Sequence, residues 1–168
     1  NGPDFTDQES VPFCVSTTVT SLDAQFTANE TVVCIGESVQ FIDQSQGSVS
    51  TWQWSFPGGS PASSTSSSPQ VVYATAGQKN ITLTVTGAGD SDSVTQNSFI
   101  TVGAEPVLTA VVANISCNGA GDGQINLSVG GGQGPYSYSW SNGATQQDIT
   151  NLSSGTYSVT VTSNSGCV

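Results

Sequence analysis

An alternation of apolar and polar residues with a period of two recurs along this chain and constrains its fold more than any other feature. Successive side chains of a β-strand point to opposite faces, so the alternation predicts strands that are buried on one side. No window shows the helical period. The sequence therefore predicts an all-β fold with turns rich in glycine, proline and serine. The expected strands are 24–28, 38–43, 51–56, 70–73, 80–86, 97–102, 107–116, 124–129, 136–140, 147–152 and 156–162.

A break at Gly103–Pro106 divides the strands into two groups. The proline cannot donate a ladder hydrogen bond and biases the residue before it toward an extended conformation, which predicts a short, stiff linker. We expect two small β-sandwich modules in tandem, at residues 22–103 and 104–168. Residues 1–21 fit neither module, and they form either the end of a preceding module or an extra edge strand. The second module is so small that it needs a covalent staple.

Lys79 is the one basic residue among 168, and the chain has no histidine. General acid–base catalysis depends mostly on histidine, and binding of phosphate or nucleic acid depends on lysine and arginine. The sequence therefore predicts a protein that is not an enzyme, needs no cofactor and binds no nucleic acid. A net charge of −11 favours divalent cations, which keeps calcium as a candidate ligand. No stretch is apolar for long enough to insert directly into a membrane.

Four cysteines, Cys14, Cys34, Cys117 and Cys167, predict disulfides and an extracellular, oxidising environment. Zinc is not expected, because the chain lacks histidine and has no C-x-x-C pair. Three pairings are open. We expect Cys14–Cys34 and Cys117–Cys167, since the first two cysteines lie in the first half and the last two bracket a compact segment. The alternative is four separate buried thiols.

Two strands carry a triplet of aromatic residues on one face: Trp52, Trp54 and Phe56 in the first module, and Tyr136, Tyr138 and Trp140 in the second. One interpretation is a stripe of exposed rings that stacks on sugar faces. The other is that each triplet belongs to a central core strand. We favour the core, because modules of this size need their largest apolar groups inside.

The segments Phe41-Ile-Asp-Gln-Ser, Trp52-Gln-Trp-Ser-Phe-Pro-Gly-Gly-Ser-Pro, Pro69-Gln-Val-Val-Tyr, Ala76-Gly and Ile81-Thr-Leu-Thr-Val-Thr lie between residues 22 and 102. Together they resemble a PKD domain, in the variant common in secreted proteins of Bacteroidetes. The resemblance implies an immunoglobulin-like β-sandwich. The chain departs from the family at Trp54-Ser-Phe-Pro-Gly-Gly, where acidic residues that are candidate calcium ligands are missing. Lys79 stands where an aromatic residue is frequent, at the entrance of a strand.

From residue 107 onward three segments carry a second resemblance: Ile115-Ser-Cys-Asn-Gly-Ala-Gly-Asp-Gly, Val129-Gly-Gly-Gly-Gln-Gly-Pro-Tyr-Ser-Tyr-Ser-Trp-Ser-Asn-Gly and Ile149-Thr-Asn-Leu-Ser-Ser-Gly-Thr-Tyr-Ser-Val-Thr-Val-Thr. They resemble the SprB repeat, which is named for a large surface adhesin of gliding Flavobacteria. The two resemblances imply a secreted or cell-surface protein of several modules that is exported by the type IX system.

Two kinds of smaller site are also expected. Asp90, Asp92 and Asp122 lie in glycine-containing turns where oxygen ligands could gather around calcium, although solvated turn carboxylates are the favoured interpretation. The EF-hand loop pattern is absent. Asp92-Ser93-Val94 resembles the O-glycosylation signal of Bacteroidetes, which makes Ser93 the candidate acceptor.

These observations predict a structural or adhesive segment of a secreted or cell-surface multi-module bacterial protein, either a non-catalytic spacer or a filament-forming unit. Its expected partners are neighbouring modules or like subunits, and a surface polysaccharide is a further candidate. In a filament, residues 1–21 would pair with the sheet edge of a neighbour. The alternative function is a carbohydrate-binding accessory region of a secreted hydrolase.

Overall fold

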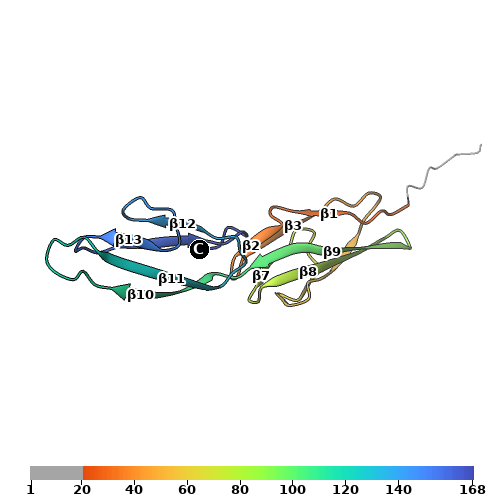
Figure 1. Ribbon diagram of the computed structural model, residues 1–168. Coiled ribbons are helices and arrows are strands. Elements are labelled where there is room, and N and C mark those ends of the chain that lie inside the picture. Colours follow the sequence, from red (N-terminus) through yellow and green to blue (C-terminus); the bar gives the residue numbers. More distant parts are fainter. Residues whose placement is uncertain (1–20) are drawn as a thin grey trace, which may run out of the picture.

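The computed structural model describes residues 21–168, which form β-strands and turns around two separate hydrophobic cores (Figure 1). The predicted all-β fold of two sandwich modules in tandem is confirmed. The modules follow one another along the long axis of the molecule (Figure 1). The described part of the chain contains no helix that could span a bilayer.

The first module is a sandwich of two sheets. One sheet has the order β1-β3-β7-β5, and the other has the order β2-β9-β8-β4-β6. The first sheet comprises β1 (Phe26–Ala28), β3 (Ser38–Asp43), β7 (Gln70–Tyr73) and β5 (Gly59–Ser60). The second comprises β2 (Val32–Cys34), β9 (Asp90–Gly103), β8 (Gly77–Gly87), β4 (Thr51–Ser55) and β6 (Ser63–Ser64).

Aromatic rings fill the space between these two sheets. Trp54 and Phe56 are stacked, with ring centroids 5.6 Å apart, and Phe41 lies 4.8 Å from Phe56. Phe26 meets Trp54 edge to face at 5.3 Å. Aromatic pairs in these geometries add to the hydrophobic stabilisation from burial, so this cluster holds the first core together.

Strand β2 is the parallel member of an otherwise antiparallel sheet. Its residues pair with the end of β9, so that Val33 lies opposite Val102 and Cys34 lies opposite Gly103. The long hairpin of β8 and β9 turns at Ala88 and Gly89, both with positive φ. Because β9 spans the whole module, its end carries the chain directly to the second module.

The second module places three strands against two. The sheet of three has the order β10-β11-β13, and β12 pairs with β14 in the sheet of two. The strands are β10 (Pro106–Ala113), β11 (Gly123–Gly131), β12 (Ser137–Trp140), β13 (Ile149–Leu152) and β14 (Val159–Thr162). Its core consists of Ile125, Leu127, Trp140, Ile149, Leu152 and Val161. This core is much smaller than that of the first module.

The Tyr73 hydroxyl lies in the first core without a hydrogen-bond partner in the described part of the chain. Lys79 Nζ lies 5.8 Å from the centre of the Tyr73 ring and donates to Thr75 Oγ1 at 3.1 Å. Lys79 lies near the beginning of strand β8. Burial raises the pKa of Tyr73 to about 12.

Replacing Tyr73 with phenylalanine is expected to raise the free energy of unfolding by about 1 kcal/mol, because it removes a buried donor that has no partner. The substitution should also change the pH dependence. The Tyr73 hydroxyl ionises near pH 10 in the unfolded chain and near 12 in the folded one. Wild-type stability should therefore fall as the pH rises from 10 to 12. Urea unfolding of both proteins below and within this range measures the effect, and a Tyr73→Phe variant that loses stability would contradict it.

Candidate functional site

The two aromatic triplets do not form exposed stripes. Trp54 and Phe56 are 1% and 0% exposed in the first core, and Trp140 is 5% exposed in the second. Trp52 packs against the edge of the first core, and Tyr136 and Tyr138 are half-buried against the second. The polar atoms of these rings are engaged as well. Trp54 Nε1 donates to the Ser66 carbonyl (2.8 Å), Trp52 Nε1 donates to Asp43 (2.7 Å), and Trp140 Nε1 donates to the Gln146 carbonyl (2.8 Å).

Several carboxylates accept hydrogen bonds from backbone N–H groups. Asp92 accepts from the amide of Ala24 at 2.7 Å, and Asp148 accepts from that of Leu127 at 2.8 Å. Hydrogen bonds to a charged acceptor are stronger than neutral ones. In a chain with one basic residue, acidic side chains thus fix loops and strand ends where other proteins often use ion pairs.

The candidate calcium ligands are not brought together. Asp90 and Asp92 belong to the β8–β9 hairpin, whereas Asp122 precedes β11 in the second module. Hydrogen bonds from Ser116 lower the pKa of Asp122, and its carboxylate accepts from the Ser116 amide at 3.0 Å. Within residues 21–168, no three acidic, cysteine or histidine side chains lie close enough to hold a metal ion. Asp122 thus closes the loop before β11.

Ser93 lies on the exposed face of β9, and its hydroxyl is 2.9 Å from that of Thr84 on β8. A second pair, Thr82 and Thr95, is 2.8 Å apart, and Thr51 pairs with Thr86 in the same way. Cross-strand hydroxyl pairs stabilise a sheet. Because Ser93 lies on the exposed face of β9, it is accessible as a glycosylation acceptor. This assignment stays a prediction.

The disulfide of the described residues joins Cys34 to Cys167, with a Cα–Cα distance of 5.7 Å. Both expected pairings, Cys14–Cys34 and Cys117–Cys167, are therefore wrong. Cys117 is exposed and has no disulfide partner in the described part of the chain, and Cys14 lies outside the described residues. The prediction paired each cysteine with its neighbour along the sequence. The observed bond crosses 133 residues and joins the two modules.

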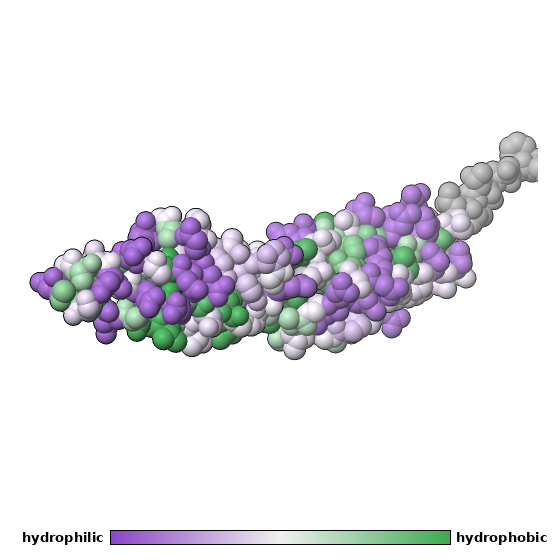
Figure 2. Space-filling view, viewed as in Figure 1, coloured by the Kyte–Doolittle hydropathy of each residue, from purple (hydrophilic) through white to green (hydrophobic). Residues whose placement is uncertain are grey.

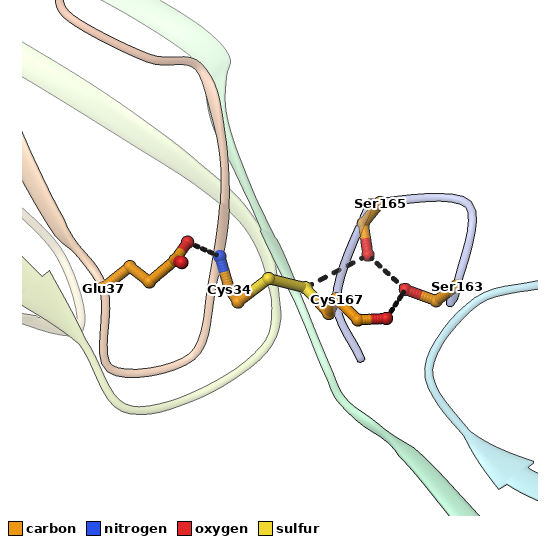
Figure 3. The surroundings of a disulfide bond; sticks show 5 residues. All are labelled: Cys34, Glu37, Ser163, Ser165 and Cys167. Carbon is orange, nitrogen blue, oxygen red and sulfur yellow. Dashed lines mark hydrogen bonds between the residues drawn. A yellow bond between two sulfur atoms is a disulfide. The ribbon is translucent and has the colours of Figure 1, made fainter. Parts of the chain in front are cut away.

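Local structure positions each half of this bond (Figure 3). Glu37 accepts from the Cys34 amide at 2.7 Å, and the Ile35 amide donates to the Gly103 carbonyl at 3.1 Å, which fixes the end of β2 beside the end of β9. Cys167 lies in a tight turn, where its carbonyl accepts from the amide and the hydroxyl of Ser163 at 2.8 and 3.1 Å. Cys167 is 1% exposed and Cys34 is half-buried, so the bond is shielded from solvent on the side of the second module.

Gly103 makes close approach of the two modules possible. A Cβ atom on this residue would lie 2.8 Å from Cys167 Sγ and would overlap the Ser165 side chain. A side chain would fit in that space only if Ser165 and Cys167 shifted. Gly103, Cys34 and Cys167 therefore form one packed junction, which is the best-defined candidate functional site of the described chain.

Comparison with known families agrees with this architecture. A family model of the PKD domain matches residues 17–102, just over half of the chain. The chain belongs to the PKD domain family. The model of the SprB repeat matches residues 109–145, so a SprB repeat follows the PKD domain in the predicted order. Both modules are typical of extracellular or surface proteins of several domains, and both are generally non-catalytic. No curated protein matches the chain.

Solved structures give three further similarities. The PKD1 domain of the metalloprotease PrtV from Vibrio cholerae is 32% identical, and the match covers 49% of this chain and 98% of that domain with a TM-score of 0.40. A carbohydrate-binding module of the β-sandwich superfamily is 20% identical, and the match covers 66% of this chain and 55% of that structure with a TM-score of 0.45. The three N-terminal domains of the outer capsid protein Hoc of bacteriophage RB49 are 20% identical. That match covers 84% of this chain and 53% of that structure with a TM-score of 0.34. The chain spans little more than half of the last two structures.

Sequence reasoning did not find the junction. Its components are a glycine at the end of a strand, a cysteine after a two-valine segment and a cysteine after Gly166. Each is common in small extracellular β-proteins and has no special meaning alone. The parallel pairing of β2 with β9 is what places Cys34 opposite Gly103, and a three-residue strand carries too few positions to show a period.

Proposed function

We propose that the PKD–SprB pair is a non-catalytic structural segment of an extracellular or cell-surface protein, which works as a stiff spacer or as the unit of a filament. The observation that carries this proposal is the Cys34–Cys167 bond, which joins the two modules at the junction. The PKD–SprB linker consists of Ala104 and Glu105 between β9 and β10. With both a short linker and a covalent bond, the two modules have little freedom to rotate against each other.

The composition of the surface supports the same function. The chain has a net charge of −11, and Lys79, its one cation, contacts Tyr73 and Thr75. A negative surface of this kind keeps a protein soluble and repels anionic membranes and nucleic acids. Partners that fit are neighbouring modules and like subunits.

Small-angle X-ray scattering of the full chain tests the spacer function. The oxidised protein is expected to scatter as a single elongated body at concentrations where it is monomeric. A Cys34→Ser/Cys167→Ser variant should instead require an ensemble of angles between the modules. Cys117→Ser is the matched control, because it removes a cysteine without touching the junction. An oxidised protein that itself requires such an ensemble would contradict the proposal.

Titration with surface polysaccharides, read by tryptophan fluorescence, separates this function from carbohydrate binding. We expect no change in emission, because Trp54 and Trp140 are core residues and Trp52 is held by Asp43. A saturable quench that disappears in a Trp52→Phe variant would favour the accessory-module function instead.

A further inference from the structure

Strand β10 leaves apolar side chains exposed on both of its faces. Val107 and Val111 are 64% and 66% exposed, and Leu108 and Val112 are 40% and 59% exposed. Figure 2 shows apolar residues along the lower margin of the second module, where Figure 1 places β10. A run of large exposed apolar residues on one strand is unusual for an isolated surface and typical of an interface.

The solvent face of β10 departs from a rule that the neighbouring strand follows. An antiparallel sheet with one solvated face normally carries polar residues on that face. Strand β11 does so with Gln124, Asn126 and Ser128. On β10 the same face carries Val107 and Val111. A partner with apolar groups on this face would explain the departure.

Strand β10 is also the longest edge strand in the described part of the chain. The other edge strands are β1, β2, β5, β6, β12, β13 and β14, with two to four residues each, whereas β10 has eight. Pro106–Ala113 carries no charge and pairs with β11 without a bulge. Edge strands are usually protected by lysine, by bulges or by short length. The outer edge of β10 is therefore open to another strand.

We propose that β10 of one copy pairs antiparallel with β10 of a second copy, so that two sheets of three strands become one continuous sheet. The inference deepens the proposed function, on which it rests, because it names a like subunit as the partner and the SprB repeat as the contact. Among the described strands, β10 alone offers a free edge that is long, uncharged and apolar on its solvent face. A second copy supplies another such edge, and a two-fold interface is self-complementary in this way.

A two-fold axis through Thr109 gives the best match of side chains. Such an axis is perpendicular to the sheet, so each face of β10 continues as the same face of the second copy. Val107 of one copy then lies opposite Val111 of the other, which pairs the two most exposed large apolar residues of β10. Cross-strand pairs of β-branched residues stabilise a sheet. Pro106, which has no N–H group to donate, falls at the end of the pairing.

The charges of the chain favour this contact and its antiparallel direction. At a net charge of −11, two copies repel each other unless the contact is uncharged. In the antiparallel register the two Glu105 residues lie about 26 Å apart along the strands, well beyond the screening length of about 8 Å at physiological salt. Asp122 lies two strands, or about 10 Å, from Glu105 of the second copy. A parallel pairing would instead set the two Glu105 residues side by side.

This arrangement points the PKD domains of the two copies in opposite directions. Strand β10 begins beside the PKD domain and runs away from it (Figure 1). Antiparallel pairing therefore joins molecules that approach from opposite sides, rather than neighbours that stand parallel on one surface. With eight residues from each copy, the contact is smaller than a standard interface of roughly 20–30 residues a side, so we expect a weak, reversible dimer.

Sedimentation velocity of the full chain tests the dimer. A Cys14→Ser/Cys117→Ser background excludes covalent dimers through these two cysteines, and it is expected to show a monomer–dimer equilibrium. Adding Val111→Lys should weaken association by roughly tenfold or more, because two ammonium groups would have to be desolvated in the joint. Ile42→Lys is the matched control, since it adds the same charge at a 39% exposed apolar position of the first module and should associate like the background. Equal association of all three proteins, or a background protein that stays monomeric to about 1 mM, would overturn the proposal.

Cross-linking tests the partner strand and its direction. Val107→Cys and Val111→Cys are made separately in the same background and treated with oxidised glutathione. Their mixture is expected to give disulfide-linked dimers, because position 107 of one copy lies opposite position 111 of the other. Each variant alone should give almost none, since like positions lie about 13 Å apart along the strands, too far for a disulfide.

Covalent dimers of Val107→Cys alone would indicate parallel pairing, and a mixture without covalent dimers would indicate that another surface or another kind of protein is the partner. Either result overturns the proposal. Neither bears on the spacer function, which the scattering of the monomer tests separately.

Discussion

A Cys34→Ser/Cys167→Ser double variant is expected to lose about 5 kcal/mol of free energy of unfolding relative to the oxidised wild type. The bond closes a loop of 133 residues, and in the chain-entropy model a loop of this length restricts the unfolded state by about that amount. The loss should be largest for the second module, whose core is small and whose C-terminal turn is held by Cys167. Denaturant unfolding followed by tryptophan fluorescence measures this effect.

Cys117→Ser provides the control for this experiment. Cys117 is exposed and has no disulfide partner among residues 21–168, so its substitution should change the free energy of unfolding by less than about 0.5 kcal/mol. Reduction of the wild type should reproduce the double variant. If the reduced and oxidised proteins unfolded at the same denaturant concentration, the bond would not stabilise the fold and the junction would lose its proposed role.

Gly103→Ala is expected to destabilise the protein by about 1–3 kcal/mol, the usual cost of overpacking a tight interior. The new methyl group would lie 2.8 Å from Cys167 Sγ and would overlap Ser165, so the C-terminal turn has to move. Because the turn is also tied to the Gln133 carbonyl through the Asn164 amide at 2.8 Å, this shift disturbs the second module as well. Calorimetry measures the loss.

Gly130→Ala and Ser165→Gly serve as controls for that loss. Like Gly103, Gly130 has no positive φ, but a Cβ atom there would meet only the Val107 carbonyl oxygen at 3.9 Å, so its variant reports a glycine-to-alanine change without overlap. Ser165→Gly removes the side chain that the Gly103 methyl group would overlap, and it should restore part of the stability lost in Gly103→Ala. A Gly103→Ala protein as stable as the wild type would show that Ser165 and the C-terminal turn can move aside at no cost in free energy.

The longer strands could be predicted because their burial alternates. In β3 and β8, buried valine, phenylalanine, leucine and isoleucine alternate with polar residues, and the sequence shows this directly. Strands β5 and β6 have two residues each and lie in segments expected to be turns, because so short a segment has no period. The first half of β9 was also missed. There, exposed hydroxyl residues alternate with half-buried Asp92, Val94 and Gln96, of which only one is apolar.

Some features of the candidate sites could likewise be predicted from the sequence, and others could not. Burial of Trp54, Phe56 and Trp140 follows from the small size of each module, so the core interpretation could be reached from the sequence. The disulfide could not, because the order of cysteines along the chain contains no information about which strand end meets which turn. The exposed face of β10 was equally hidden, since its apolar residues predict a buried strand. Its exposure depends on how many strands lie in the opposing sheet.

The position of the disulfide determines how the molecule responds when it is pulled by its two ends. Tension that enters at the N-terminus passes through β1 and β2 to Cys34, crosses the bond to Cys167 and leaves at Val168. Strands β3 to β14 lie inside the loop that the bond closes and outside this covalent path. A single oxidised molecule should therefore lengthen by about 450 Å less than a reduced one at full extension, at roughly 3.4 Å for each bypassed residue. The SprB repeat is thus protected from mechanical unfolding while it remains exposed at the side of the load-bearing chain.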